Sequence, residues 1–241
     1  MRDAMKWLVL GLVSVAVFVL TFLKTPESIA SMLQGVAADA RTYSAIVHAL
    51  FVVVAAVGLF FKRSRSVLFA SFIAFLSLSA TAVAVRYVIA PNVILFGVFF
   101  ALILHAYFTK QLTFTLESVA PVDLLFGLVG LVFGFWYLHW VDSPVWANAL
   151  LYSPLGSANC PTMLTVAGFL CLSQRPRSDL LEAFVGLMTL YFGFFGIFRL
   201  GAYVDVALVV CGLYLIVRLA SRLSYSGAFG EEMRTIAPKP R

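Results

Sequence analysis

The triplet Cys160-Pro161-Thr162 follows Asn159 at the start of an apolar run. A thiol at the N-terminus of a helix gains thiolate character, and thiolates support redox and nucleophilic chemistry. A simpler interpretation is a helix start, in which a polar cap precedes a proline whose missing N–H is tolerated in the first turn. Capping accounts for the proline but does not require sulfur. Cys160 and Thr162 are therefore candidate binding residues, with the capping interpretation left open beside them.

Two arginines stand at the ends of apolar runs, and each is followed six residues later by a small polar residue. They are Arg86 with Asn92, and Arg199 with Asp205. In one interpretation, each arginine extends to the lipid headgroups. In the other, Asp205 neutralises Arg199, whereas Asn92 leaves Arg86 as a cation that can bind an anion or carboxylate. These four residues complete a predicted binding site near the outer side of a membrane.

The three histidines, His48, His105 and His139, lack the spacing of a ligand set. Only His48 and His139 are expected at matching depth, as the two axial ligands of a haem must be. The sequence contains no HExxH motif and no glycine-rich phosphate loop. Asp123 and Glu182 fall near helix ends, where solvated or helix-capping roles are expected. We therefore predict no metal, no cofactor and no catalytic residue, and favour a protein that is not an enzyme.

The elements that must position these residues are apolar helices. Apolar residues make up 62% of the 241 positions and charged residues only 12%, with a mean hydropathy of +1.00. Soluble domains carry about 25% charged residues, so the composition indicates a lipid environment. The runs are continuous and mostly near the roughly 20 residues that cross a bilayer, whereas barrel strands alternate. The sequence predicts an all-α, polytopic transmembrane bundle of about eight spans. These are Trp7–Leu23, Tyr43–Phe61, Val67–Val85, Asn92–Phe108, Val122–Val141, Pro161–Ser173, Leu180–Phe198 and Tyr203–Leu219.

The distribution of lysine and arginine predicts the orientation. With the N-terminus inside, thirteen of the 17 basic residues fall in cytoplasmic segments, as the positive-inside rule requires. We predict a protein of the cell (inner) membrane with both termini cytoplasmic and with residues 223–241 as a cytoplasmic tail. The first run is long for the core of a signal peptide, so it is interpreted as a retained span. The net charge of +6 then reflects topology and contact with the bilayer, with no nucleic-acid partner.

A tandem repeat is indicated within the single membrane domain, residues 1–222. The loop Lys62–Ser66 aligns with Gln174–Ser178, 112 positions later, and each loop precedes a 19-residue apolar span that ends on an arginine. The predicted copies are roughly residues 1–110 and 121–222. Since each copy has four spans, both enter from the same side, in the parallel arrangement of some transporters.

The polar segment Lys24–Thr42 lies between the first two predicted spans. Its apolar residues Ile29, Met32, Leu33 and Val36 recur at helical spacing. This pattern predicts a short interfacial helix.

Glycines recur at close spacing in two predicted spans. The fifth contains Gly127, Gly130 and Gly134, and the seventh contains Gly186, Gly193 and Gly196. Small residues let membrane helices approach closely. They predict either packing within the chain or an interface between copies of it.

The stretch Tyr152–Val217 resembles a bacterial family of uncharacterised multi-pass membrane proteins, a domain-of-unknown-function family. The resemblance extends over roughly Thr25–Val217, with the first half similar in Thr25-Pro26-Glu27, Ala90-Pro91-Asn92 and Phe96-Gly97. The resemblance rests on Cys160-Pro161-Thr162 opening a helix, on the Arg/Pro loop Gln174–Ser178 and on Asp205 opening the last span. It implies a multi-pass topology and singles out these residues. It implies no activity, because none is established for the family.

Three function classes stay open. The repeat and the lack of catalytic constellations favour a transporter or channel for a small solute or ion, with its site near the outer side. Few polar groups fall in the middle of the spans, which favours a non-catalytic scaffold or regulatory subunit. Such a protein would act with a membrane partner subunit or as a homo-oligomer. A membrane enzyme that uses a redox thiol or a bound cofactor is the third alternative.

Overall fold

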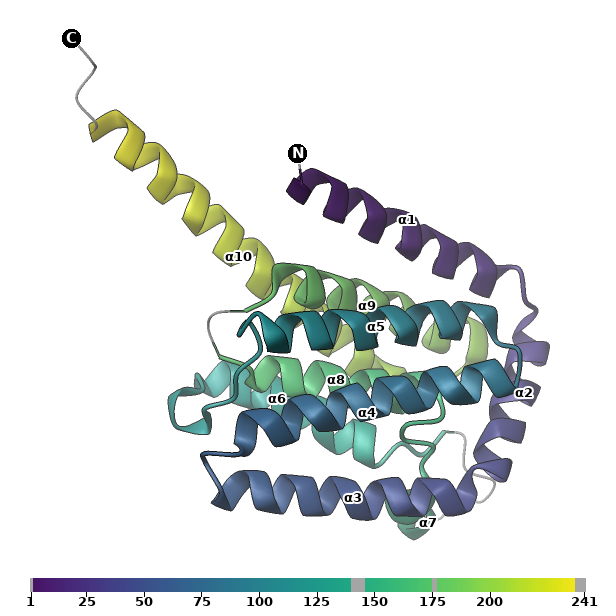
Figure 1. Cartoon of the computed structure of the whole chain (residues 1–241). Coiled ribbons are helices and arrows are strands. Elements are labelled where there is room, and N and C mark those ends of the chain that lie inside the picture. The colour runs from purple at the N-terminus through teal and green to yellow at the C-terminus, as the bar shows by residue number, and fades with distance from the viewer. Residues whose placement is uncertain (1, 140–145, 175–176, 237–241) are drawn as a thin grey trace.

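The computed structural model describes residues 2–139, 146–174 and 177–236, and this part of the chain is helical without strands (Figure 1). Short 3-10 turns at Leu116–Ser118 (η1) and Tyr203–Asp205 (η2) join some of the helices. The α-helices are α1 (Arg2–Phe22), α2 (Pro26–Asp39), α3 (Arg41–Phe60), α4 (Arg65–Arg86), α5 (Ala90–Phe108), α6 (Pro121–Phe135), α7 (Trp146–Tyr152), α8 (Asn159–Leu172), α9 (Asp179–Leu200) and α10 (Val206–Ile236).

Six helices are long and apolar enough to cross a membrane: α1, α3, α4, α5, α9 and α10. Their length and composition support an integral membrane protein. The predicted spans Val122–Val141 and Pro161–Ser173 form shorter helices, α6 and α8, of 15 and 14 residues. At 1.5 Å per residue each is only about 22 Å long, less than the roughly 30 Å of a hydrocarbon core. Residues 140–145, which include the end of that fifth predicted span, lie outside the described residues.

Helix α8 forms the centre of the bundle, and all of its residues are buried. The glycines of α6 allow its close approach, because a Cβ added at Gly130 would lie 2.7 Å from the Cα of Gly168 on α8. On α9, a Cβ at Gly193 would meet the backbone of α10 at 2.9 Å. These glycines therefore pack helices of the same chain against one another, which is the first of the two alternatives predicted for them.

The predicted short helix after the first span is present as α2. Thr25 caps it by accepting a hydrogen bond from the N–H of Ser28, and Pro26 occupies its first turn. The residues it buries are Ile29, Leu33, Val36 and Ala37. Figure 1 shows α2 lying across the ends of the longer helices. An amphipathic helix in this position covers one end of the bundle.

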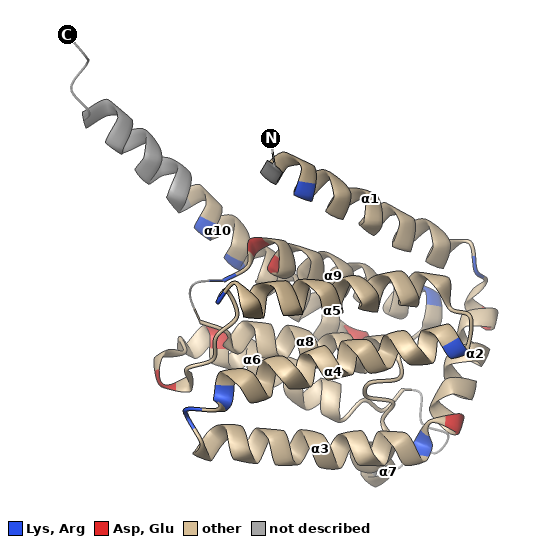
Figure 2. Ribbon diagram, in the orientation of Figure 1, with Lys and Arg blue, Asp and Glu red and all other residues tan. Residues whose placement is uncertain are grey.

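The helices alternate in direction, which gives the bundle two ends (Figure 1). We call the end where α4, α6 and α9 begin the Arg218 end, and the end where α3, α5, α8 and α10 begin the Asp205 end. Figure 2 shows basic residues near both ends. The alignment partners Arg175 and Pro176 in the second loop lie outside the described residues. Helix α10 continues to Ile236, well into the predicted tail.

Candidate functional site

Asp205 is fully buried at the turn that joins α9 to α10. Gly201 ends α9 in the left-handed region, with φ of 67°, so the chain can reverse there without the strain of a Cβ. Gly196, one turn earlier, leaves room for the carboxyl, since a Cβ at that position would lie 1.7 Å from Oδ2 of Asp205. Two glycines thus place a carboxyl group inside the bundle, against the start of α8.

Neutral donors hold the carboxyl group of Asp205. The hydroxyl of Tyr137, itself fully buried, donates to Oδ1 at 2.6 Å. The thiol of Cys160 donates to Oδ2 at 3.3 Å. No lysine, arginine or histidine in the described part of the chain forms an ion pair with Asp205. The carboxyl group is therefore hydrogen-bonded but lacks a protein counter-charge.

The expected ion pair between Asp205 and Arg199 does not form. The guanidinium of Arg199 lies over the ring of Phe22 on α1, 4.7 Å from its centroid, and its Nε has no hydrogen-bond partner. The physical reason is direction: the turn after α9 carries Asp205 inward to α8, while Arg199 extends toward α1. Nearness in sequence does not bring these two side chains together.

An amide pair lies beside Cys160. Asn92, in the first turn of α5, and Asn159, the first residue of α8, donate to each other, with Asn159 Nδ2 at 2.9 Å from Asn92 Oδ1. Both are buried. Helix α8 does start here with Pro161 in its first turn, as the helix-start interpretation held, but its cap is Ala158 and the side chain of Asn159 bonds Asn92 instead. The pair joins α5 to α8, across 67 residues of sequence.

Thr162 has a structural contact one turn into α8. Its hydroxyl oxygen accepts a hydrogen bond from the N–H of Gly156 at 2.9 Å, and the side chain is fully buried. Gly156 has φ of 76° and turns the chain before α8. Thr162 therefore fixes the loop that leads into Cys160.

A cavity of about 40 Å³ borders this cluster. It extends from Thr21 and Lys24, at the junction of α1 and α2, to Cys160 and the amide pair. A buried water needs roughly 10–15 Å³ of such space and two or more polar partners. The cavity has the volume for a small ligand or water, but most of its lining is apolar, and polar groups border it only near Lys24 and at the amide pair and thiol.

Comparisons with protein-family models, with curated proteins and with solved structures find no match. The argument about function therefore rests on the geometry of the chain.

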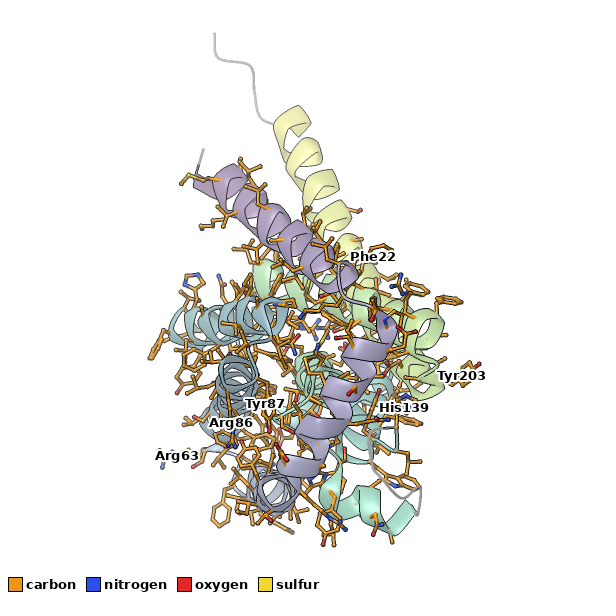
Figure 3. The ribbon with its side chains drawn as sticks, turned by 90° about the vertical axis from the view of Figure 1, so that its right-hand side faces the viewer. Phe22, Arg63, Arg86, Tyr87, His139 and Tyr203 are labelled. Carbon is orange, nitrogen blue, oxygen red and sulfur yellow. The ribbon has the colours of Figure 1, made fainter. Side chains whose placement is uncertain are left out.

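The candidate residues separate into two groups. Asn92, Cys160, Thr162 and Asp205 gather at the start of α8, as a shared site requires. Arg86 and Arg199 do not join them. Arg86 ends α4 as an exposed side chain beside Tyr87, and Figure 3 shows the two labelled residues together at that helix end. The site thus contains an acid and amides but neither of the arginines.

Sequence reasoning missed Tyr137. The aromatic residues around it in the sequence are typical of a belt at a membrane interface, but Tyr137 is fully buried and donates to a residue 68 positions away. A tyrosine in an interfacial belt and a tyrosine with a buried hydroxyl occur in the same local pattern of aromatic residues. No signal in the sequence separates them.

The thiol of Cys160 is not placed for thiolate chemistry. It donates its proton to a carboxyl oxygen, and all three cysteines are buried and free. Thiolate reactivity needs an electropositive, accessible setting. This geometry gives no support to the redox-thiol alternative.

His48, one of the two histidines expected at matching depth, is engaged on both sides. In His48, Nδ1 lies 2.7 Å from the carbonyl oxygen of Ser44 and Nε2 lies 2.8 Å from that of Phe135. A metal ligand needs one free ring nitrogen. Within the described ranges, no three His, Cys, Asp or Glu side chains are grouped closely enough to share a metal ion.

The Arg218 end holds a second group of acids, which the sequence led us to expect as solvated or capping residues. Asp123 and Glu182 are both buried, so a solvated role is wrong for them, although each lies in the first turn of its helix, α6 or α9. Asp123 accepts from Arg218 at 2.8 Å, Arg177 at 3.1 Å and the Tyr214 hydroxyl at 2.6 Å. Segments distant in sequence bring these partners together.

Glu182 completes the network at the Arg218 end. It accepts from Arg218 Nε at 2.5 Å and from Arg222, which also contacts Asp179 at 3.0 Å. Each buried acid at this end thus has two arginine partners. The network links the starts of α6 and α9 to α10.

Proposed function

We propose that this chain is a transporter or channel of the cell (inner) membrane for a small solute or ion, in which Asp205 exchanges a proton or a monovalent cation. The observation that carries the proposal is a fully buried carboxyl group with neutral donors and no basic partner among the described residues. Ionisable residues inside membrane helices are rare and mark ion pathways and proton relays.

The physical argument concerns the charge of Asp205. Insertion scales give about 2.5–3.5 kcal/mol for an ionised carboxylate at a helix centre. Asp205 lies at the turn between α9 and α10, so its cost comes from its complete burial among neutral groups. A basic partner would compensate for it, but none is present in the described residues. The carboxyl group therefore needs a proton or a bound cation to be neutral. The cavity that reaches Cys160 from the α2 end comes within one side chain of Asp205, because the Cys160 thiol contacts its carboxyl group.

The proposed topology has eight membrane segments, with α6 and α8 as short ones enclosed by longer helices. The positions of the basic residues support an Arg218 end and both termini on the cytoplasmic side. In many transporters, short or interrupted helices form the binding site. The proposal includes the four-plus-four repeat and the relationship to the family of unknown function that carries the Cys-Pro-Thr motif.

The test is labelling with dicyclohexylcarbodiimide, which is membrane-soluble and reacts with protonated carboxyl groups. Purified protein in liposomes is labelled over a range of pH, and modified peptides are identified by mass spectrometry. We expect Asp205 to be modified increasingly as the pH falls. The matched controls are Asp123 and Glu182, which should stay unmodified because arginine side chains occupy both oxygens of each carboxyl group.

The outcomes separate the two forms of the proposal. Protection of Asp205 by sodium ions would identify a cation site, and indifference to sodium would identify a proton site. An Asp205 that is unreactive at every pH while the protein stays folded would contradict the proposal.

A non-catalytic scaffold is the second candidate, and the ion-pair network at the Arg218 end favours it. A network that joins α6, α9 and α10 resists the relative movement of helices that transport requires. A transporter and a scaffold differ in whether ions cross the membrane of liposomes that contain the protein. Equal flux through the wild type and Asp205→Asn, with labelling intact in the wild type, would favour the scaffold.

A further inference from the structure

A separate pocket opens between α3 and α4 at the Asp205 end, with a volume of about 480 Å³. One wall is apolar and comes from α4. It consists of Phe75, Leu78, Ala82 and Val83. Phe75 and Leu78 are 36% and 50% exposed, so this wall faces the surroundings of the bundle. For a membrane-spanning helix such as α4, those surroundings are acyl chains.

Charges of both signs stand at the rim of this pocket. Arg86 is the last residue of α4, and Asp39 is the last residue of α2. Both are exposed, and neither forms an ion pair within the described ranges. Tyr87 lies between them: its hydroxyl donates to Asp39, and the Arg86 guanidinium lies 5.7 Å from its ring centroid. Figure 3 shows Arg86 and Tyr87 side by side at this end.

The polar groups deeper in the pocket are already satisfied. The hydroxyls of Tyr43 and Ser79 bond to each other, and Ser79 donates to the carbonyl oxygen of Gly156. The charged groups that can contact a ligand are therefore those at the rim, one cation (Arg86) and one anion (Asp39). A free phosphate or a sugar would leave the apolar wall without a partner. A ligand with a charged head and an apolar tail matches both parts.

We infer that this pocket binds a phospholipid whose headgroup carries a primary ammonium, such as phosphatidylethanolamine. The planar guanidinium of Arg86 suits a phosphate, with two parallel N–H donors. The carboxylate of Asp39 accepts from the ammonium, and one acyl chain lies along Phe75 and Leu78. Phosphatidylglycerol offers Asp39 no positive charge, and the quaternary ammonium of phosphatidylcholine has no N–H to donate.

The experiment is native mass spectrometry of the whole chain in detergent, titrated separately with phosphatidylethanolamine, phosphatidylglycerol and phosphatidylcholine. The wild type should retain phosphatidylethanolamine best. Arg86→Gln should weaken its binding about tenfold, the usual effect of losing a charge-assisted hydrogen bond. Asp39→Asn should preserve binding but remove most of the preference over phosphatidylglycerol.

Two further variants make the test specific. Arg199→Gln is the matched control, because Arg199 is an arginine at the same end that does not line the pocket. It should bind lipid like the wild type. Ala82→Trp fills the wall and retains both charges, so it should reduce binding of all three lipids.

Several results would overturn the inference. Equal retention of the three lipids by the wild type would do so, as would an equal loss in Arg199→Gln and Arg86→Gln. Displacement of the lipid by inorganic phosphate alone would indicate a simple anion site instead. The measurement needs no transport activity, so its outcome is independent of the role of Asp205.

Discussion

The two ends of this bundle treat buried acids in opposite ways. At the Arg218 end, Asp123 and Glu182 each contact two arginines. At the Asp205 end, a carboxyl group that is equally buried contacts a tyrosine hydroxyl and a thiol. Arg199 stands only six residues before Asp205, yet its guanidinium lies over the rings of Phe22 and Phe195 and not beside the carboxyl group.

Under the function proposed above, this difference separates a structural role from an exchangeable one. Ion pairs with several hydrogen bonds hold acids ionised and fix the helices that carry them. An acid with only neutral donors is stable when protonated or when it holds a cation. We therefore interpret the Arg218 end as the clamp of the bundle and the Asp205 end as the place where a charge is exchanged.

The largest effect should come from breaking the clamp with Arg218→Leu. This change removes the ion pairs to Asp123 and Glu182 and two hydrogen bonds to the carbonyl oxygens of Leu170 and Cys171. Breaking a buried pair by removing one partner costs about 3–5 kcal/mol. We expect a loss of that size in the free energy of unfolding, measured by denaturant titration in mixed micelles. A loss below about 1 kcal/mol would mean that the network does not clamp the helices.

A smaller effect is expected from Gly196→Ala, which acts at the other end. The new Cβ would occupy the position of the Asp205 carboxyl group, and overpacking of this kind costs about 1–3 kcal/mol. It should also disturb the pH dependence of carbodiimide labelling at Asp205. Gly11→Ala is the control, because a Cβ there meets no atom within 4 Å. Equal behaviour of the two variants would show that the carboxyl group is loosely held.

Asp205→Asn should change stability by less than about 1 kcal/mol, because the amide oxygen still accepts from Tyr137 and no counter-charge is stranded. When Asp205→Asn is combined with Arg199→Leu, the two changes in the free energy of unfolding should add within about 0.5 kcal/mol, as they do for independent sites. The double-mutant cycle is measured by the same unfolding titration. A coupling energy above 1 kcal/mol would show that Asp205 and Arg199 interact after all, as the sequence led us to expect.

The smallest effect concerns Glu117, an exposed acid in η1 that contacts Lys62 and Arg65. A backbone hydrogen bond within the residue itself, followed by those from Lys62 and Arg65, lowers the pKa of Glu117 to about 2. A lowered folded-state pKa stabilises the fold above the ordinary value of 4.5, and the contribution is lost as the pH falls from 4.5 to about 2.

The measurement is the melting temperature of the wild type and Glu117→Gln at neutral pH and at pH 3. The small difference at neutral pH should shrink at pH 3. A difference that grows on acidification would contradict this assignment.

The sequence by itself determined what depends on local composition. Continuous apolar runs identify the long helices, because a backbone in lipid must satisfy its own hydrogen bonds. The spacing of Ile29, Leu33 and Val36 predicts α2, because period and caps are properties of a short segment. The sequence singles out Asp205 and Asn92 because polar residues beside long apolar runs are conspicuous, and Cys160 because its thiol stands at a helix start.

Only the tertiary structure decided which groups meet. Tyr137 and Asp205 are 68 residues apart, and Arg218 and Asp123 are 95 apart, so no local pattern records these contacts. The same applies to Arg199, whose direction depends on the turn at Gly201 and on where α1 packs. The charge of a buried acid depends on its neighbours in space, and helix packing chooses those neighbours.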